Sequence, residues 1–274
     1  MCAMQRERID RRLVSEGLAD SRAKAQALVA AGRVFADGMR VEKSGTMVSS
    51  SSSVTVRGDG DRWVSRGAHK LLKGLEVFGT SPEDRDCVDL GASTGGFTQV
   101  LLERGARRVW AVDVGYGQLA WMLRQDPRVT VMERVNARAV TPEDFGGAVG
   151  LVVADLSFIS LKLVLPAIRS ILAPEGESIV LVKPQFEIGK GRVGKGGVVR
   201  AKEDHRTVLR EILAFCSAET GLKPVGLSFS PVTGPKGNIE FLLHLLPDGS
   251  GKERSVPDPE AVVDEAHDFF RKEG

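Results

Sequence analysis

Apolar residues along most of the chain follow two alternating spacings, one typical of strands and one typical of helices. Short aliphatic runs predict strands at 87–91, 108–115, 129–134, 150–157, 178–184 and 238–246. Between these runs the apolar positions recur every three or four residues, which predicts helices at 69–78, 97–104, 118–124, 161–173 and 202–219. This alternation predicts an α/β fold, with a doubly wound, mostly parallel sheet that binds ligands at the carboxyl ends of its strands.

The amino-terminal region has a different pattern and is expected to form a small α+β unit. Helical spacing is interrupted at Gly17, Ser21 is placed to cap a second helix, and Asp37-Gly38 predicts a hairpin turn between two short strands. The apolar residues with helical spacing are Ile9, Leu13, Leu18, Ala23, Ala27, Leu28 and Val29. The expected boundaries are 1–57 for this unit, 58–66 for a linker, 67–250 for the α/β domain and 251–274 for a tail that ends in a helix.

The composition is that of an ordinary globular protein, but the charge is unevenly distributed. The 274 residues are 42% hydrophobic and 27% charged, with a formal net charge of +2. Residues 1–80 contain 14 lysines and arginines against 9 acidic residues, whereas the remainder contains 24 against 27. A basic amino-terminal quarter is expected of a module that binds a polyanion, although a solvated basic surface would have the same composition.

The cysteines and the apolar runs exclude several other classes of protein. Cys2, Cys87 and Cys216 are isolated from one another and from histidines at ligand spacing, which argues against a disulfide framework and against a metal site. The first residues lack the apolar core of a signal peptide, and no apolar run approaches the ~20 residues that a membrane span needs. We therefore expect a cytoplasmic protein with no metal, no membrane partner and no obligate protein partner.

The first strand of the α/β pattern is followed by a glycine turn and a helix, in the segment VDLGASTGGFTQVL. Gly91, Gly95 and Gly96 would let the backbone pass close to a ligand, where a Cβ atom would collide. The next strand ends near Asp113, which lies 24 residues after Asp89. This is close to the ~20-residue offset at which an acid meets ribose hydroxyls. The combination indicates a cofactor that contains adenosine.

The residues around the first glycine favour S-adenosyl-L-methionine over NAD. The dinucleotide pattern GxGxxG does not fit, because Ala92 and Ser93 follow Gly91. The acid Asp89 would repel a pyrophosphate but attract an amino group and a sulfonium. Asn136 would hydrogen-bond the adenine edge, or would simply satisfy a turn. The expected cofactor contacts are Asp89, Gly91, Ala92, Ser93, Thr94, Gly95, Gly96, Phe97, Asp113, Asn136 and Asp155.

Charged residues stand at the ends of strands that are expected to be buried. Asp155 follows the apolar run LVVA, and Lys183, followed at once by Pro184, ends the strand SIVLV. Because the carboxyl ends of parallel strands share one edge of a sheet, both side chains should point into the same crevice. Glu240, in the last predicted strand, and Lys70, at the start of a helix, could join them there. A purely structural ion-pair network is the alternative interpretation.

Several long motifs in a fixed order make this sequence resemble the TlyA family of bacterial rRNA 2′-O-methyltransferases, some of which are named hemolysins. The motifs are RWVSRGAHKL (62–71), DLGASTGGFT (89–98), DVGYGQLAW (113–121), NAR (136–138), ADLSFISL (154–161), VKPQFE and GKG (182–191), and GN-E (237–240). The resemblance covers about residues 6–246. It implies an S4-like RNA-binding domain followed by a Rossmann-like class I methyltransferase domain of the FtsJ type.

The resemblance also implies a reaction, a substrate and a set of site residues. The reaction is the S-adenosyl-L-methionine-dependent 2′-O-methylation of cytidine in 16S and/or 23S rRNA, so the partner would be rRNA or ribosomal subunits. The family's Lys-Asp-Lys-Glu tetrad falls on Lys70, Asp155, Lys183 and Glu240. The residues expected to contact RNA are Arg6, Arg8, Arg11, Arg12, Arg22, Lys24, Arg33 and Arg66.

General chemistry agrees with these implied roles. A ribose hydroxyl is a very weak acid, so its attack on a methyl group needs proton removal as the bond forms. A desolvated lysine beside another cation gives up its own proton more readily, which makes Lys183 the expected base. Asp155 would orient it, while Lys70 and Glu240 would position the hydroxyl and its phosphate.

Three alternatives remain open from the sequence. A non-catalytic RNA-binding ribosome-assembly factor would not need the intact tetrad. A pseudouridine synthase with an S4 domain would need a catalytic aspartate in a different fold and no cofactor loop. A membrane-active hemolysin would need an amphipathic or membrane-spanning segment, and none is apparent in the sequence.

Overall fold

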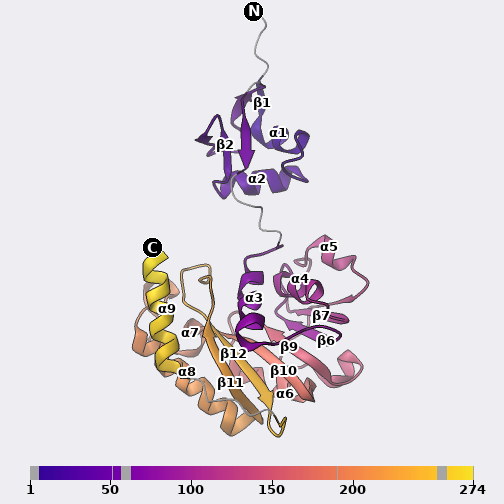
Figure 1. The fold of residues 1–274 in the computed structure, drawn as a ribbon, viewed down its shortest axis with the longest axis vertical. Helices are drawn as coiled ribbons and strands as arrows, with labels where there is room; N and C mark the ends of the chain where they lie inside the picture. The colour runs from indigo at the N-terminus through magenta and orange to yellow at the C-terminus, as the bar shows by residue number, and fades with distance from the viewer. Residues whose placement is uncertain (1–5, 51, 57–62, 190, 252–257, 274) are drawn as a thin grey trace, which may run out of the picture. The chain divides into compact units, whose positions relative to one another are not determined.

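The chain divides into two compact units, Met1–Arg62 and Trp63–Gly274 (Figure 1). The structure is a computed structural model that describes residues 6–50, 52–56, 63–189, 191–251 and 258–273. Most of the expected linker, 58–62, lies outside the described residues. Trp63, within the expected linker 58–66, is buried in the second unit against the apolar cluster that includes Leu71 and Phe97.

The amino-terminal unit is an α+β unit built from short elements. They are β1 (Arg6–Arg8), α1 (Ile9–Ser15), α2 (Arg22–Ala30), β2 (Val34–Ala36), β3 (Met39–Arg40), β4 (Met47–Ser49) and β5 (Val54–Val56). The side chain of Ser21 accepts a hydrogen bond from the backbone N–H of Lys24, as a helix cap does. Asp37 and Gly38 both have positive φ, at 49° and 80°, which confirms the predicted hairpin between β2 and β3.

The buried face of these two helices differs in part from the predicted one. Ile9, Leu13, Leu28 and Val29 are buried in the core of the unit as expected, but Ala23 and Ala27 are exposed and Leu18 is 37% exposed. Ala19 and Ala25 are buried in their place. Leu18 and Ala19 lie in the turn between the two helices, and within α2 the buried residues Ala25, Leu28 and Val29 lie three and four positions apart, on one face that excludes Ala23 and Ala27.

The second unit has the α/β architecture that the sequence predicts. Its elements are α3 (Gly67–Phe78), β6 (Asp86–Leu90), α4 (Gly96–Glu103), β7 (Arg108–Asp113), α5 (Trp121–Arg124), β8 (Val129–Glu133), η1 (Pro142–Phe145), β9 (Val149–Ala154), η2 (Leu161–Leu163), α6 (Leu165–Ile171), β10 (Leu172–Val182), α7 (Pro184–Glu187), η3 (Lys195–Gly197), α8 (Lys202–Phe215), η4 (Cys216–Thr220), β11 (Leu222–Phe229), β12 (Phe241–Pro247) and α9 (Pro259–Glu273). In the described residues they form a seven-stranded sheet with the order β11-β12-β10-β9-β6-β7-β8. β12 is antiparallel to both of its neighbours, and the other pairs are parallel.

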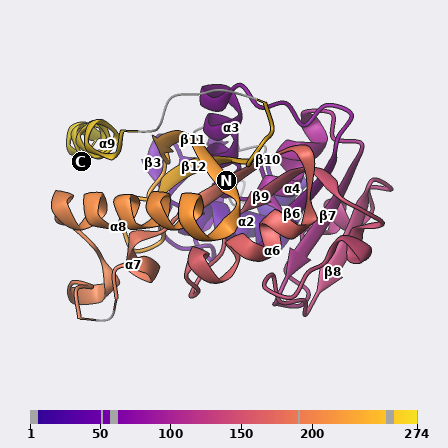
Figure 2. The ribbon, with the colours of Figure 1, turned by 90° about the horizontal axis from the view of Figure 1, so that it is seen from below.

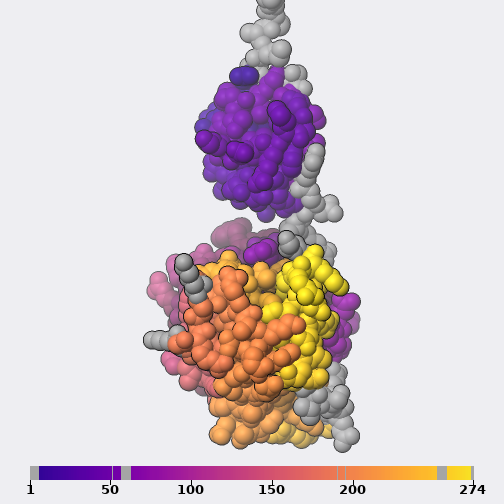
Figure 3. All heavy atoms as spheres, turned by 90° about the vertical axis from the view of Figure 1, so that its left-hand side faces the viewer, coloured from indigo at the N-terminus to yellow at the C-terminus, as the bar shows by residue number. Residues whose placement is uncertain are grey.

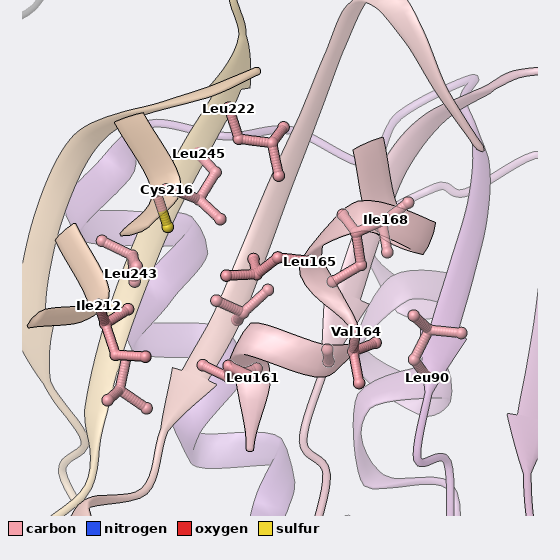
Figure 4. Packing of buried hydrophobic residues seen from close by; sticks show 14 of the residues in the cluster. Leu90, Leu161, Val164, Leu165, Ile168, Ile212, Cys216, Leu222, Leu243 and Leu245 are labelled. Atoms are coloured by element: carbon pink, nitrogen blue, oxygen red, sulfur yellow. The ribbon is translucent and has the colours of Figure 1, made fainter. Parts of the chain in front are cut away.

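Helices cover both faces of this sheet because residues along each central strand alternate between two apolar clusters. In β10, Val180 and Val182 face the cluster that contains α6 and α8, whereas Ile179 and Leu181 face the cluster that contains α3 and α4. Figure 2 shows α6 and α8 running across one face. Figure 4 shows Leu165 and Ile168 of α6 packed into this first cluster.

The sequence analysis missed β11. This strand contains Pro224 and Gly226, two residues that interrupt a strand pattern. They are tolerated because β11 is an edge strand, and its pairing with β12 shifts register between these two residues.

The carboxyl-terminal helix α9 packs alongside α8, and the two can be followed in the orange and yellow regions of Figure 3. Lys202 and Arg206 of α8 both pair with Asp264 of α9, at 2.6 and 3.0 Å. Between these pairs, Nδ1 of the buried His205 lies 2.9 Å from Nε2 of His267. The tail is therefore part of the folded second unit.

Candidate active site

The glycine turn after β6 has a shape that larger residues could not adopt. Gly91 and Gly95 have positive φ, at 86° and 99°. A Cβ atom on Gly91 would lie 2.7 Å from the backbone oxygen of Asp155, and one on Gly95 would lie 2.2 Å from the side chain of Leu123. The turn is thus packed directly against the segment that follows β9, where one of the predicted charged residues stands.

Two cavities open along the carboxyl edge of the sheet. The first has a volume of about 300 Å³ and is lined by the glycine turn, the start of α3 and all four predicted tetrad residues. The second, of about 410 Å³, is lined by the ends of β7 and β8 and by the segment after β9. Gly91, Ser93, Asp155 and Ser157 line both cavities, so the two are adjacent, and together they are called the crevice below.

Most of the predicted cofactor contacts line this crevice. Those in the first cavity are Gly91, Ala92, Ser93, Thr94, Gly96, Phe97 and Asp155, and those in the second are Gly91, Ser93, Asp113, Asn136 and Asp155. The carboxylate of Asp113 accepts hydrogen bonds from the backbone N–H groups of Ser93 and Gly115, at 2.8 and 2.7 Å. Asn136 lines the second cavity, as expected of a cofactor contact, and its Oδ1 also accepts the turn hydrogen bond from Arg138 N that the alternative interpretation requires.

Asp89 occupies a different position from the one expected. It is fully buried under the glycine turn and, like Gly95, lines neither of the two cavities within the described chain. Its Oδ2 accepts a hydrogen bond of 2.7 Å from Thr98 Oγ1, while Oδ1 has no hydrogen-bond partner among the described residues. Burial is the main cause that raises the pKa of Asp89 to about 7. The hydrogen bond from Thr98 lowers this pKa, and the nearby carboxylates of Asp155 and Asp113 raise it further.

The raised pKa of Asp89 predicts a pH-dependent stability. An aspartate in the unfolded chain ionises near pH 3.8, whereas folded Asp89 keeps its proton up to about pH 7, so this residue destabilises the fold increasingly as pH rises between these values. In the cofactor-free protein, we expect Asp89→Asn to gain stability relative to wild type by up to about 4 kcal/mol between pH 4 and pH 8. Urea denaturation at each pH measures this difference. A difference that does not change with pH would contradict the prediction.

The four predicted tetrad residues meet in one chain of alternating charges. Lys183 Nζ lies 2.6 Å from Asp155 Oδ1, Lys70 Nζ lies 3.0 Å from Asp155 Oδ2, and Lys70 Nζ lies 2.7 Å from Glu240 Oε2. Lys70, Lys183 and Glu240 are only 8, 7 and 1% exposed. Each buried charge therefore has an opposite charge beside it, which offsets the cost of removing it from water.

The topology of the sheet explains why these residues meet. Asp155 and Lys183 directly follow the parallel strands β9 and β10, and Lys70 lies in the first turns of α3. Glu240 was expected inside the last strand, but it directly precedes β12, whose first residue Phe241 pairs with Val182. Because β12 runs in the opposite direction to β10, the residue before β12 lies at the same edge as the residue after β10.

Burial and the neighbouring charges shift the pKa values of Asp155 and Lys70 in opposite directions. Burial alone would raise the pKa of Asp155, but Lys70 and Lys183 outweigh it and hold that pKa below its ordinary value. Burial alone would lower the pKa of Lys70, but Asp155 and Glu240 outweigh it and hold that pKa above its ordinary value. At neutral pH, Asp155 is therefore ionised and Lys70 is protonated.

Sequence reasoning missed other residues of the crevice. Lys183 Nζ donates a hydrogen bond of 3.0 Å to Ser157 Oγ. The next residue, Phe158, is 91% exposed at a positive φ of 64°, and its ring centroid lies 5.3 Å from that of Phe186. Glu187 accepts hydrogen bonds from the residues that begin η2. These residues belong to the motifs ADLSFISL and VKPQFE, in which the sequence analysis assigned roles only to Asp155 and Lys183.

The residues proposed to contact RNA lie in several environments. Arg6, Arg11, Lys24 and Arg66 are exposed, and Arg66 lines the first cavity. Arg8 and Arg22 both bind the buried carboxylate of Asp10, and Arg33 is half-buried. Arg12 is only 8% exposed, because its guanidinium donates hydrogen bonds to the backbone oxygens of Ser49 and Ser52.

The described residues offer neither a candidate membrane-spanning helix nor a candidate metal site. Among the residues that the structure describes, no helix is both long enough and apolar enough to cross a membrane. In the same part of the chain, histidines, cysteines and acidic residues form no group of three or more that could hold a metal ion.

Comparisons with known proteins agree with this architecture. Residues 63–246 match the FtsJ-like methyltransferase family, and residues 7–54 match the S4 domain. The chain is 54% identical to the Mycobacterium tuberculosis H37Rv protein named 16S/23S rRNA (cytidine-2′-O)-methyltransferase TlyA, over 88% of this chain and 90% of that protein. It is 48% identical to YqxC of Bacillus subtilis, named as a candidate rRNA methyltransferase, over 98% and 96% of the two chains.

The match extends to a solved structure of similar length. A protein from Streptococcus thermophilus, described as a candidate hemolysin, has a TM-score of 0.78 and 44% sequence identity, and the match covers 99% of each chain. Both the α/β fold with its preceding S4 domain and the expected class of enzyme are thereby confirmed. The chain, which joins an S4 domain to an FtsJ-like methyltransferase domain, belongs to the TlyA family.

Proposed function

We propose that this protein transfers the methyl group of S-adenosyl-L-methionine to the ribose 2′-hydroxyl of cytidine in ribosomal RNA. The observation that carries the proposal is the chain of alternating charges from Lys183 through Asp155 and Lys70 to Glu240, at the wall of the crevice beside the glycine turn. The name of the Mycobacterium tuberculosis relative supports cytidine and the rRNA of both subunits. The S4 domain supports an RNA substrate, and this substrate implies a cytoplasmic location.

The residues of the crevice fit the proposed cofactor. The tight turn at Gly91 lets the backbone approach a ligand, and the second cavity combines the carboxylate of Asp113 with apolar walls that include Ile159. Asp113 would hold the ribose hydroxyls, and Asn136 would lie beside the base. S-adenosyl-L-methionine, when bound, supplies a methyl group on a positively charged sulfonium.

The four tetrad residues divide the work of proton removal and positioning. The 2′-hydroxyl proton would pass to the amine nitrogen of Lys183 as the hydroxyl oxygen attacks the methyl group that the cofactor would supply. Asp155 holds Lys183 in place through one carboxylate oxygen and pairs with Lys70 through the other. Lys70 and Glu240 position the hydroxyl and its phosphate, and such positioning supplies several kcal/mol of rate enhancement.

The test is a mapping of the methylated nucleotides. Small and large ribosomal subunits from cells that lack this protein are incubated with the purified protein and S-adenosyl-L-methionine, and rRNA fragments are analysed by mass spectrometry and alkaline hydrolysis. We expect added methyl groups on cytidine ribose, which make the adjacent phosphodiester resistant to alkali. Cofactor binding without methyl transfer would favour a non-catalytic assembly factor, and methyl groups on the bases would contradict the proposed reaction.

Substitutions of two neighbouring arginines in α1 can distinguish a residue that contacts RNA from a residue that stabilises the fold. Arg11 is exposed, whereas Arg12 is buried and binds two backbone oxygens. We expect Arg11→Gln to weaken rRNA binding and to reduce the slope of log affinity against log salt by about 1, with unchanged stability. Arg12→Gln should instead destabilise the S4 domain by about 1–3 kcal/mol. Filter binding at several salt concentrations and thermal denaturation measure the two effects, and identical behaviour of the variants would contradict this assignment.

A further inference from the structure

Lys183 has two close partners, and they constrain its nitrogen in different ways. Nζ lies 2.6 Å from Asp155 Oδ1, yet this oxygen has no properly aligned hydrogen-bond partner among the described residues. The contact is therefore a close ion pair. By contrast, Nζ donates a well-formed hydrogen bond of 3.0 Å to Ser157 Oγ. Ser157 thus supplies the directional contact.

The direction of this nitrogen matters for a base. A neutral lysine amine carries two hydrogens and one lone pair in a tetrahedral arrangement around nitrogen. With one hydrogen held by Ser157 and the other attracted by Asp155, the lone pair is left to point in the remaining direction. Lys183 lines the first cavity, where the hydroxyl of the substrate would be held. Without Ser157 the amine could rotate and present a hydrogen instead of the lone pair.

The segments that carry these two side chains are joined beyond the pair. Ser160 Oγ and Leu161 N, both C-terminal to Ser157, donate hydrogen bonds of 2.6 and 2.8 Å to the carboxylate of Glu187. Between these contacts and the Ser157–Lys183 bond, the rings of Phe158 and Phe186 meet. The backbone segment that carries Ser157 is therefore tied to the segment that carries Lys183, as the positioning of one side chain by the other requires.

We propose that Ser157 is a positioning residue for methyl transfer, whose hydroxyl oxygen orients the amine of Lys183 toward the hydroxyl that loses its proton. The inference rests on the proposed function, in which Lys183 is the base. Ser157 also lines both cavities, so it stands where the base meets the cofactor crevice.

Three serine variants test this role. We expect Ser157→Ala to lower kcat by about 10- to 100-fold, with the KM for rRNA and the calorimetric Kd for the cofactor changed by less than about twofold. The acidic limb of its rate–pH profile should move to lower pH, because an acceptor that stabilises the ammonium form is lost. Ser157→Thr keeps the acceptor and should restore most of the rate. Ser170→Ala, whose hydroxyl donates to Ala167 within α6, is the matched control and should behave as wild type.

Several outcomes would overturn the inference. One is a wild-type kcat in Ser157→Ala, and another is a Ser157→Thr variant as slow as Ser157→Ala. A third is a Ser157→Ala variant that binds the cofactor more weakly but keeps its kcat, which would make Ser157 only part of the cavity wall. Thermal denaturation checks that each variant is folded. Lys183→Ala in the same assay distinguishes failure of the proposed base from failure of the role of Ser157. If Lys183→Ala is active, the proposed base is wrong. If it is inactive while Ser157→Ala has the wild-type kcat, only the role of Ser157 is wrong.

Discussion

Replacing Lys183 with alanine is expected to lower kcat for methyl transfer by about 10²- to 10⁴-fold, the contribution usual for a general base. The cofactor Kd should change little, because the residues that would hold the nucleoside, such as Asp113, are untouched. The fold should remain stable, since Asp155 keeps its ion pair with Lys70 at 3.0 Å. Single-turnover methyl transfer, calorimetric cofactor binding and thermal denaturation measure the three quantities.

A second substitution at position 183 tests whether methyl transfer needs a base there or only a positive charge. Lys183→Arg keeps a positive charge beside Asp155, but a guanidinium does not lose its proton at any usable pH. We therefore expect the arginine variant to be nearly as inactive as the alanine variant. An active arginine variant would mean that the position needs a cation and not a base, and wild-type turnover in Lys183→Ala would exclude Lys183 from catalysis altogether.

Replacing Lys70 with methionine is expected to destabilise the protein by about 3–5 kcal/mol in addition to abolishing activity. The ammonium of Lys70 lies between Asp155 and Glu240, and Glu240 is only 1% exposed. Its removal leaves the buried carboxylate of Glu240 without the cation that compensates it. Urea denaturation at pH 7 measures the loss. The two lysines should thus differ, because only the removal of Lys70 strands a buried charge.

A double variant and a pH series refine this prediction. Lys70→Met with Glu240→Gln removes both charges and should recover part of the lost stability. The raised pKa of Lys70 means that its contribution is complete below its ordinary value of 10.5 and is lost only above it. The lowered pKa of Asp155 means that its contribution is complete above 3.8 and is lost as pH falls below that. In the wild-type protein both contributions are therefore constant from pH 6 to 9. A double variant less stable than the single one would contradict the charge-pair explanation.

The sequence identified the residues of the charge chain because a simple rule governs their placement. Asp155 and Lys183 end apolar runs, and the carboxyl ends of parallel strands share one edge of a sheet. Glu240 was harder to place, since no local pattern reveals that β12 is reversed or that Glu240 precedes it by one residue. In this case the motif order that resembles the TlyA family supplied what periodicity could not.

Other features depend on contacts between distant segments and could not be predicted. Arg12 looks like a surface charge paired with Glu16, but its guanidinium also binds backbone oxygens 37 and 40 residues away. Asp89 stands beside the glycine turn in the sequence, yet the packing of that turn buries it completely. Ser157 is an unremarkable serine until the fold brings it within 3.0 Å of Lys183. Each role follows from tertiary structure, not from the type of residue.

The central claim, that the amine of residue 183 takes up the substrate proton, can be tested by changing the basicity of that amine. Lys183→Cys treated with 2-bromoethylamine carries an amine at nearly the same place, made less basic by the thioether. The wild-type protein treated in the same way controls for alkylation of the native cysteines, of which Cys87 and Cys216 are buried. We predict restored methyl transfer with the acidic limb of the single-turnover rate–pH profile moved to lower pH. Restored activity with an unmoved profile would contradict the claim, because the group that titrates would then lie elsewhere.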